Sequence, residues 1–427
     1  MKGKLIMKDK EILQKLQVKF NQTLRKCENI FSRPVYKFIY QMVFGIIKSG
    51  EVKTGQIAKS LHEGISFKKT EERLGHHLGK EDLYKEIQRA HILMYSSDLK
   101  RCLYHIVDLT DIQKEYAKKM DGLDKVRDGD KDVIGTGYYM CNITSVDESG
   151  ELIVPIYSDL YSLKEENTSE NKKILEATEL VISGSRKESI FVCDRGMDRI
   201  EIMKPLLKDH TYFIIRQRGN RNLFYGEKKK SFKQVSRIVT LHLSYQVRKR
   251  KKKKTIVRTY TAGAAQVRLP DSKQNLWLMV SKGEGRGYTW YLAYLPQSVT
   301  SEKKACDIIF TGYGLRWKIE EYHRQIKCDF HIEDIRLQRY QALKTMIALL
   351  NLAVSFIYAK LDSIIITMFF ETKTAGFYKR RLSELQGFIY YKLTYAVKEF
   401  FNKSEVRLKL PYKSNKKSQI ELNFEYG

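Results

Sequence analysis

Residues 313–327 read YGLRWKIEEYHRQIK. At 100° per residue its spacing predicts an amphipathic helix with one apolar stripe, made of Leu315, Ile319, Tyr322, Ile326 and Phe330. Four polar residues fall within about 60° of one another on the opposite face, and we call them the polar row: Tyr313, Arg316, Glu320 and Lys327. A carboxylate between cations and a phenol is a set of groups suited to bind a polyanionic backbone, such as that of a nucleic acid, together with a metal ion. The alternative is that the polar row is an ordinary charged helix face exposed to solvent.

The composition predicts a folded protein with a polyanionic partner. The chain has 427 residues, of which 42% are hydrophobic and 30% charged, which is enough for two or three domains with a sizeable core. The 78 Lys and Arg outnumber the 50 Asp and Glu, so the net charge is +28. Such an excess indicates nucleic acid as the partner, with a membrane surface as the competing explanation.

Several sequence features argue against membrane insertion, export and zinc. The longest apolar run, Met346–Ala359, has 14 residues, which is too short to span a bilayer and predicts a buried helix. The first residues lack the apolar core of a signal peptide, so we expect a cytoplasmic protein without a membrane partner. The six cysteines are far apart and form no CxxC pair, which indicates neither a zinc site nor a disulfide framework.

Residues 1–98 are predicted to form a helical N-terminal DNA-binding domain. Pro34 introduces an apolar helix that ends at Gly50. Residues 54–79 then predict two helices around a break at Gly64, with Ser66 as the N-cap of the second. A basic second helix is the outline of a helix-turn-helix. Helix pairs of this length are also common in any helical domain.

Residues 99–216 predict an α/β core. Three strand-like runs come first, over 102–108, 135–146 and 150–162, and a charged loop separates the first two. A helix, a strand ending at Asp194, a second helix and a further strand follow, which is an α/β order. Asp108 is predicted to end the first strand. Acids at strand ends lie where open α/β sheets place their ligands.

Residues 217–300 predict a β-rich basic insertion. From Arg218 to Arg258 there are 15 Lys and Arg and one acid, so this segment carries half of the chain's net charge. We expect contact with the DNA backbone here; a solvated hairpin tip or a nuclear-import signal is the alternative. The cations assigned to this contact are Arg248, Lys249, Arg250, Lys251 and Lys252.

The last two segments are predicted to be helical. Residues 301–335 contain the helix of the polar row, and residues 336–427 form a helical C-terminal region with helices over 340–372 and 376–402.

Three acids stand out by context: Asp108, Asp194 and Glu320. If they converge, their oxygens suit two Mg²⁺ ions, or Mn²⁺, and phosphodiester chemistry, but they do not suit zinc. Asp111 is the alternative to Asp108. Glu321 lies 100° from Glu320 around the helix and outside the polar row, and Asp198 is expected on a helix surface.

These motifs resemble the DDE transposases of bacterial insertion sequences, in the group with a Tyr–Arg–Glu–Lys signature. The signature spacing is Tyr, two residues, Arg, three residues, Glu, six residues, Lys, and the polar row matches every step. In the family, the first acid lies in a D-x-T context, and Asp108-Leu109-Thr110 match it. Its V-x-D-R context of the second acid is matched by residues 192–195. The resemblance covers about residues 100–330.

The resemblance implies an RNase H-like catalytic core with Asp108, Asp194 and Glu320 as catalytic metal ligands. It implies that Tyr313, Arg316 and Lys327 contact DNA phosphates. Trp290 corresponds to a tryptophan that stacks on a flipped base, although a core role fits it equally and Trp277 is the weaker alternative. Further candidate DNA contacts are Arg195, which alternatively pairs with Asp194, together with Arg216 and Arg218.

The expected function is cleavage at insertion-sequence ends and strand transfer into target DNA by a homodimer assembled on double-stranded DNA. A stand-alone nuclease on the same fold is the first alternative. A catalytically inactive DNA-binding remnant or repressor is the second, and the presence of all three acids argues against it.

Overall fold

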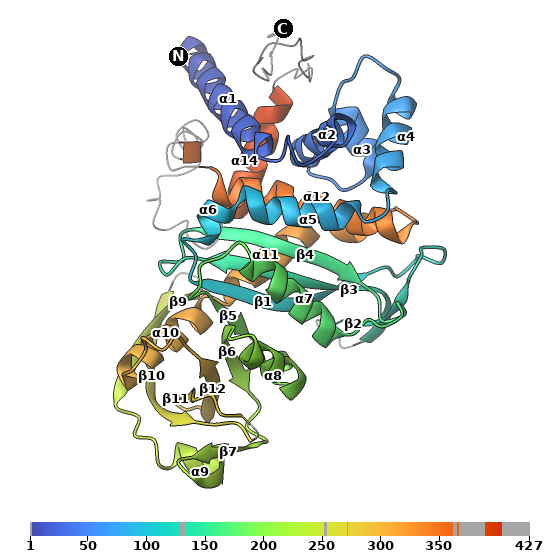
Figure 1. Ribbon diagram of the computed structural model, residues 1–427. Coiled ribbons are helices and arrows are strands. Elements are labelled where there is room, and N and C mark those ends of the chain that lie inside the picture. Colours follow the sequence, from blue (N-terminus) through green and yellow to red (C-terminus); the bar gives the residue numbers. More distant parts are fainter. Residues whose placement is uncertain are drawn as a thin grey trace.

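One mixed sheet of ten strands runs through the protein, with most helices gathered at one end of it (Figure 1). The computed structural model describes residues 2–128, 133–251, 254–270, 272–361, 365–366 and 389–403. Within these ranges only the backbone is described for residues 2–9, 128, 248–251, 254–255, 389–391 and 403.

Five strands make the core of the sheet, in the order β4–β3–β1–β5–β6. The strands β1 (Tyr104–Gln113), β3 (Val133–Val146) and β4 (Ile153–Tyr161) form an antiparallel meander. The strands β5 (Ile190–Cys193) and β6 (Tyr212–Gln217) run parallel to β1. Helix α7 (Glu170–Ile182) connects β4 to β5, and α8 (Ile200–Lys208) connects β5 to β6. This order and these directions confirm the predicted α/β fold with an RNase H-like core.

The first strand is longer than predicted. The sequence predicted that it ends at Asp108, but β1 continues to Gln113 and pairs with β3 along its whole length, from Tyr104↔Val146 to Gln113↔Gly137. The charged loop that follows also contains β2 (Asp124–Asp128), which pairs with β3. Asp108 therefore lies in the middle of a strand, because backbone pairing with β3 overrides the change from apolar to polar side chains.

The insertion extends the core sheet. Strand β12 (Tyr288–Tyr294) pairs antiparallel with β6, and β11 (Leu276–Gly283), β10 (Lys254–Val267) and β9 (Leu243–Lys251) follow outward. A small hairpin of β7 (Asn222–Tyr225) and β8 (Lys228–Ser231), followed by α9 (Phe232–Ser236), lies beside it. The β-rich character of this segment is as predicted.

The N-terminal segment is helical throughout its described part. It contains α1 (Lys2–Arg25), α2 (Arg33–Ser49), α3 (Thr54–Ser60), α4 (Phe67–Leu78), α5 (Leu83–Met94) and α6 (Ser96–Leu99). Pro34 lies in the first turn of α2, and the Ser66 side chain caps α4 by accepting a hydrogen bond from the Lys69 backbone, as predicted.

Helix α12 (Tyr340–Ala359) packs against β4, α5 and α2. Among the described residues it is the one helix long and apolar enough to cross a membrane, and nearly all of that length is buried in the protein. It ends at Ala359 and not at 372 as predicted, while much of the second predicted helix appears as α14 (Ile389–Lys403). The remainder of that prediction lies outside the described ranges.

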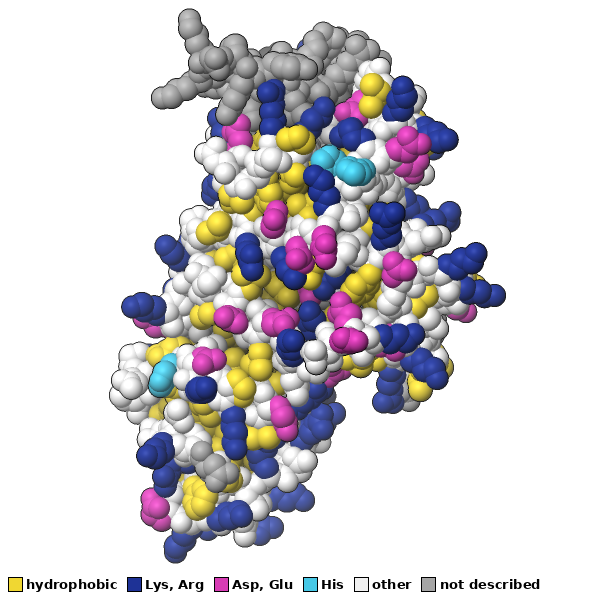
Figure 2. Space-filling model, turned by 45° about the vertical axis from the view of Figure 1, so that its right-hand side comes forward, with side chains coloured by type: hydrophobic (Ala, Val, Ile, Leu, Met, Phe, Trp, Pro, Cys, Tyr) yellow, Lys and Arg dark blue, Asp and Glu magenta, His cyan; other side chains and the backbone are white. Residues whose placement is uncertain are grey.

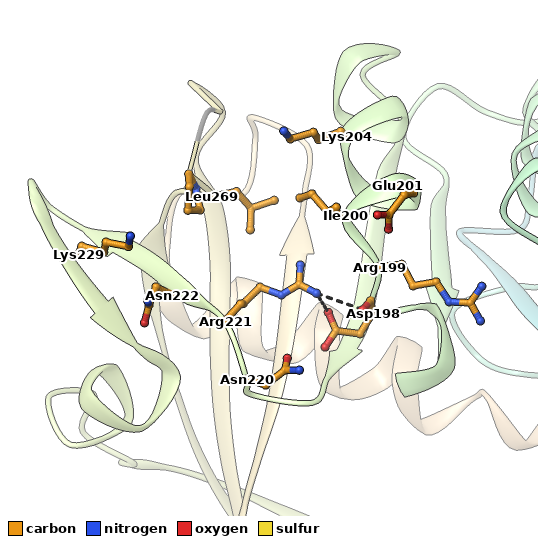
Figure 3. A pocket seen from close by; sticks show the side chains of 11 residues that line it. Asp198, Arg199, Ile200, Glu201, Lys204, Asn220, Arg221, Asn222, Lys229 and Leu269 are labelled. Carbon is orange, nitrogen blue, oxygen red and sulfur yellow. Dashed lines mark hydrogen bonds and ion pairs between the residues drawn. The ribbon is translucent and has the colours of Figure 1, made fainter.

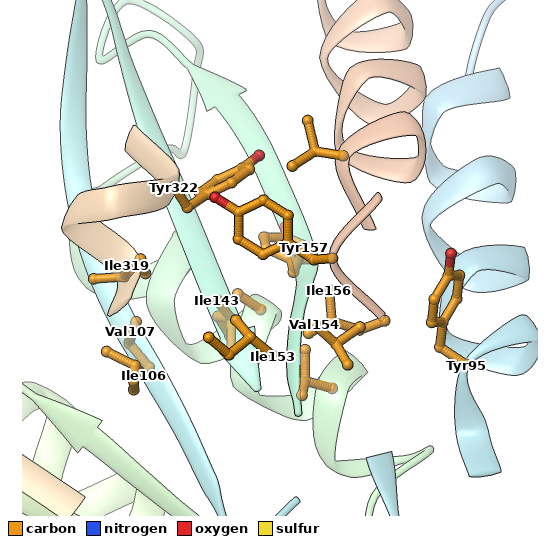
Figure 4. Close-up of a cluster of buried hydrophobic side chains, with 14 of the residues drawn as sticks. Tyr95, Ile106, Val107, Ile143, Ile153, Val154, Ile156, Tyr157, Ile319 and Tyr322 are labelled. Atoms are coloured by element: carbon orange, nitrogen blue, oxygen red, sulfur yellow. The ribbon is translucent and has the colours of Figure 1, made fainter. Parts of the chain in front are cut away.

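The predicted apolar stripe is buried against the sheet, except for Leu315, which is half-buried. Ile319 and Tyr322 lie among residues of β1, β3 and β4, including Val107 and Ile143 (Figure 4). Ile326 and Phe330 continue the stripe and are fully buried. This packing fixes the opposite, polar side of the helix relative to the strands.

The buried His105 on β1 should make stability fall in acid. Burial lowers its pKa to about 3, with the charge of Arg186 as a smaller cause, while an unfolded histidine titrates near 6.5. Since the folded pKa is the lower one, the unfolded state binds more protons between these values, and stability is lost as the pH falls from 6.5 toward 3. In urea titrations between pH 6 and 4, His105→Gln should reduce the slope of unfolding free energy by up to about 1.4 kcal/mol per pH unit.

The matched control for this measurement is His210→Asn, at an exposed site whose left-handed backbone asparagine tolerates. The control should keep the wild-type slope. An unchanged slope in His105→Gln would contradict the account.

Candidate active site

Strands β1 and β5 place Asp108 and Asp194 side by side. The parallel register pairs Val107 with Cys193, and each acid is the next residue along its chain. Adjacent strands lie about 4.8 Å apart, so the two carboxyl groups leave the sheet next to each other. Asp194 follows the end of β5 and caps the short helix η1 (Arg195–Met197) by accepting the Gly196 backbone N–H.

Glu320 reaches the same place from two helices that the sequence predicted as one. The predicted helix over 313–327 is interrupted: α10 (Glu302–Gly314) ends, and α11 (Trp317–Cys328) begins, with Leu315 and Arg316 in a turn. The short-range bond from Arg316 N–H to Tyr313 O (3.2 Å) marks the tighter winding there.

The approach of α10 to the sheet requires a glycine. A Cβ on Gly312 would lie 2.6 Å from the Tyr104 ring, so only a residue without a side chain lets α10 cross β1 so closely. The Tyr104 hydroxyl donates a hydrogen bond to Ile308 O (3.1 Å) in the same helix. The interruption after α10 then lets α11 bury the apolar stripe independently of this crossing.

Arg316 joins the first and third acids. Its Nη1 lies 3.4 Å from Asp108 Oδ2, and its Nη2 forms a close ion pair with Glu320 Oε1. Asp108 and Arg316 are 18% and 22% exposed, so their side of the bridge is largely shielded from solvent, whereas Glu320 is 53% exposed. One guanidinium therefore neutralises two carboxylates that come from a strand and a helix more than 200 positions apart.

The electrostatics around Asp108 favour a further positive charge. The pKa of Asp108 is raised to about 7, chiefly by burial. The charge of Arg316 and the Leu109 N–H lower this pKa, whereas the nearby Asp194 and Glu320 raise it. In the described part of the chain no three acids, histidines or cysteines surround a single point closely enough for a metal ion, because Arg316 lies between Asp108 and Glu320. The guanidinium stands in for a cation, and the oxygen-only donor set fits a hard divalent ion.

Tyr313 and Arg216 border this cluster. The Tyr313 ring packs edge-to-face on Tyr291 of β12, with centroids 4.7 Å apart. Tyr291 lies opposite Arg216 of β6 in the sheet register. Because β6 and β12 join the core to the insertion, these two candidate DNA-contacting residues lie at that junction.

Lys327 and Asp111 lie together, apart from the acid cluster. Lys327 Nζ is 3.8 Å from Asp111 Oδ2 and 3.4 Å from Glu333 Oε1. Asp111 therefore shares its cation with Glu333, whereas Asp108 shares its cation with Glu320. The polar row thus divides into an N-terminal part at the acids and a C-terminal part about 10 Å further along the helix.

Asp198 is not the surface residue that the sequence predicted. Its side chain is fully buried and forms an ion pair with Arg221 (2.5 Å) (Figure 3). It also accepts a hydrogen bond from the Arg218 backbone N–H (2.6 Å). Asp198 ties the turn after Asp194 to the start of the insertion, a role that local sequence did not indicate because its partner lies 23 residues away.

Arg195 forms no ion pair with Asp194 among the described side chains. Its carbonyl oxygen accepts a hydrogen bond from Arg218 Nε at 3.3 Å, so Arg195 and Arg218 are neighbours next to Asp194.

Trp290 has several partners within the insertion. Its indole N–H donates to Ser236 Oγ (2.6 Å), and its ring packs edge-to-face on Phe232. It also lies against Gly219, where a Cβ would approach the ring to 2.6 Å and where the backbone has φ +80°. Trp277 is partly buried on β11. Trp317, which no sequence pattern indicated, is 40% exposed at the start of α11, and the Lys318 ammonium lies 4.3 Å from its ring centroid.

The basic run lies on the outermost hairpin. Arg248, Lys249, Arg250 and Lys251 are on β9, where Arg248 pairs with Val257 and Lys251 with Lys254 of β10. Their side chains, and the whole of Lys252, lie outside the described part of the structure.

A buried polar network, also missed in the sequence, connects α11 to the sheet. The His323 ring contacts Asn142 Nδ2 (3.0 Å), and Asn142 is the β3 partner of Asp108. Ser158 Oγ donates to Asn142 Oδ1 (2.6 Å) and lies 2.8 Å from the Tyr322 hydroxyl. A satisfied network of this kind fixes the rotation of α11, and with it the direction of Glu320.

An acid cluster on an RNase H-like sheet, beside a helix with a cationic face, defines a class of nucleic-acid-processing enzymes. Residues 160–356 match the family model described as the transposase DDE domain. The match extends from β4 to α12 and includes Asp194 and Glu320. This segment, a little under half of the chain, is similar to the DDE domains of transposases, the enzymes of DNA transposition.

Two further comparisons add no support. The chain has no match among the curated proteins. It aligns with the cryo-EM structure of a piggyBac transposase synaptic complex with hairpin DNA at 12% identity and TM-score 0.40, over 96% of this chain and 83% of that one. A likeness of that size carries no argument about fold or function. The bacterial insertion-sequence group named from the signature stays a prediction.

The charge at Asp108 should destabilise the protein without metal. In thermal melts with EDTA at pH 8, Asp108→Asn should stabilise the protein by about 1–3 kcal/mol, because a buried charge beside two other acids is removed. The gain should shrink as the pH falls through 7, where the folded wild type takes up a proton at Asp108. Asp111→Asn, which loses a partner of Lys327, should give no gain. Equal gains in both variants would contradict this account.

Proposed function

We propose that the protein cuts DNA at the ends of a bacterial insertion sequence and joins the freed 3′ ends to target DNA, with Asp108, Asp194 and Glu320 as its catalytic acids. The observation that carries this proposal is the convergence of Asp108 and Glu320 on one arginine, with Asp194 on the strand next to Asp108. Asp111 is assigned a different role because it faces Lys327.

The three acids would hold two Mg²⁺ ions, or Mn²⁺. Bound there, the ions supply a nucleophile at neutral pH and stabilise the leaving oxygen of the phosphodiester. The protein's own contribution is a buried carboxyl whose pKa is raised by burial and neighbouring acids, and which therefore gains most from a cation. Arg316 would turn from the carboxylates to a DNA phosphate when the cations are bound.

The other cations would hold the DNA on either side of this centre. Tyr313 and Arg216 lie at the junction with the insertion, and Arg195 and Arg218 lie at the rim beside Asp194. The hairpin of β9 and β10 would extend the contact outward through Arg248 to Lys251 and onward to Lys252. Figure 2 shows Lys and Arg side chains across the whole visible face, and they outnumber the acids at the lower end, which the insertion forms.

We assign Trp290 to the packing of the insertion and not to a flipped base. Its indole N–H and its ring already have partners in Ser236, Phe232 and Gly219. Release of that ring would cost these contacts.

Cutting two ends and joining them to one target requires both ends at one place, so we propose that a homodimer acts on DNA. The enzyme would work in the cytoplasm, where a bacterial element and its target DNA both lie.

The catalytic assignment is tested by Glu320→Gln on labelled DNA that carries the ends flanking the gene, with Mg²⁺. Specific cleavage should fall by at least about 10²-fold, since one ligand of the cations is lost, while DNA binding in anisotropy should persist. Glu321→Gln is the matched control, because that side chain is one position away on another face of α11, and it should keep wild-type cleavage. Retained cleavage in Glu320→Gln would overturn the assignment.

The same assay separates the proposed reaction from its alternatives. A pre-cut end with a free 3′-hydroxyl should be inserted into a second duplex. Cleavage without regard to the ends, and without insertion, would favour a nuclease. Binding by the wild type with neither reaction would favour a repressor.

Arg316 should compete with metal ions for the acids. In calorimetric titration with Mg²⁺, Arg316→Met should bind more tightly than wild type, by about tenfold, because the guanidinium no longer neutralises Asp108 and Glu320. Cleavage should nevertheless fall, because the phosphate contact is lost. Lys327→Met, which removes a cation from the other part of the polar row, should leave Mg²⁺ affinity unchanged. Weaker Mg²⁺ binding by Arg316→Met would contradict the competition.

A further inference from the structure

A groove lies beside the C-terminal part of the polar row. It has a volume of about 860 Å³, and its lining includes Asp111, Tyr116, Lys118, Lys119, Lys327 and Arg336. Asp111 lies on the same strand as Asp108, three residues further on, which is about 10 Å in an extended chain. The groove therefore lies about 10 Å from the proposed acid centre, a distance of about three nucleotides along one strand of a duplex.

The loop that forms one wall of the groove is held at both ends. Lys114 Nζ donates to Glu333 O (2.7 Å) and to Ile335 O. The Asp121 N–H donates to Gln338 O (2.9 Å). The residues between these contacts, including Tyr116, Lys118 and Lys119, are thus presented by an anchored loop.

Three acids of the groove already have cations, and Glu115, the fourth, forms no ion pair within the described part of the chain. Three cations of the groove likewise have no acid. Lys327 faces Asp111 and Glu333, and Lys53 pairs with Asp334 at 2.8 Å. Within the described part of the chain, Lys118, Lys119 and Arg336 form no ion pair. The charge left for a ligand in this groove is positive.

Tyr116 supplies an aromatic surface next to those cations. Its side chain is 87% exposed, the highest value for any large hydrophobic side chain in the described ranges. A hydrophobic ring held in water on an anchored loop gains by stacking on a flat ligand. Aromatic rings interleaved with cations are the means by which proteins bind unpaired nucleotides, whose base faces are accessible as those of a duplex are not.

We propose that this groove binds unpaired nucleotides of a DNA strand next to the cleavage position, with Tyr116 stacked on a base. Lys118, Lys119 and Arg336 contact the phosphates of the same strand. The inference rests on the proposed function, and it adds a binding site that the acids and the polar row do not provide. Strand separation at a cut end exposes such nucleotides.

The test compares one duplex in blunt form and with a three-nucleotide single-stranded overhang. Binding is measured by fluorescence anisotropy without divalent ions, so that no cleavage occurs. The wild type should bind the overhang duplex about 5- to 100-fold more tightly, the range expected for stacking on one base. Tyr116→Ala should remove this preference and leave blunt-duplex binding unchanged, whereas Tyr116→Phe should keep it.

Tyr395→Ala is the matched control, since Tyr395 is also exposed but lies on α14, outside the groove. A preference that survives Tyr116→Ala, or an equal loss for both DNAs, would overturn the proposal. So would a wild type that binds blunt and overhang duplexes alike, an outcome that leaves the transposase function intact. If the wild type binds neither DNA, the proposed function fails as well.

The lysines give an independent measurement. The measurement is the slope of the logarithm of DNA affinity against the logarithm of salt concentration. For the overhang duplex, the magnitude of this slope should be smaller by about 1.4 in the Lys118→Ala, Lys119→Ala double variant, which is about 0.7 for each single-strand phosphate contact. The slope for the blunt duplex should not change. An equal decrease for both DNAs would place these lysines on the duplex and contradict the groove assignment.

Discussion

The arginine shared by Asp108 and Glu320 is the interaction on which the proposed centre depends. Three acids near one point repel one another, burial of Asp108 adds to the cost, and Arg316 neutralises part of this charge. The arrangement is poor for stability and useful for chemistry. Because Asp108 is costly to ionise alone, it gains from a bound cation. In the proposed mechanism, Arg316 takes the place of that cation and then turns to a DNA phosphate.

The surrounding fold serves to hold these groups in register. Parallel pairing of β1 with β5 sets Asp108 beside Asp194, and the apolar stripe with the Asn142–His323 contact sets the rotation of α11. The insertion is part of the same structure, since β12 pairs with β6 and Asp198 binds Arg221 beside the Asp194 turn. The proposed DNA contacts of the insertion are therefore mechanically connected to the acids.

Much of this was predictable from local patterns. The helices of the N-terminal segment, the α/β order and the buried stripe of α11 followed from periodicity and from Pro34 and Ser66 at helix starts. The errors occur where a distant segment decides. Pairing with β3 carries β1 past Asp108, the crossing of α10 over Tyr104 interrupts the predicted helix, and Arg221 draws Asp198 into the interior. None of these partners lies close in sequence.

The sequence by itself determined which residue types are present and at what spacing: three acids in distinctive contexts, a row of Tyr, Arg, Glu and Lys, and a strongly basic insertion. Helical and extended periodicities are local properties, so such patterns are visible without a structure. Only the tertiary structure decided that Asp108 shares Arg316 with Glu320 while Asp111 belongs to Lys327, and that Tyr116 faces a groove beside them. Electrostatic energies depend on distances of a few ångströms, and chain folding alone sets those distances between segments far apart in sequence.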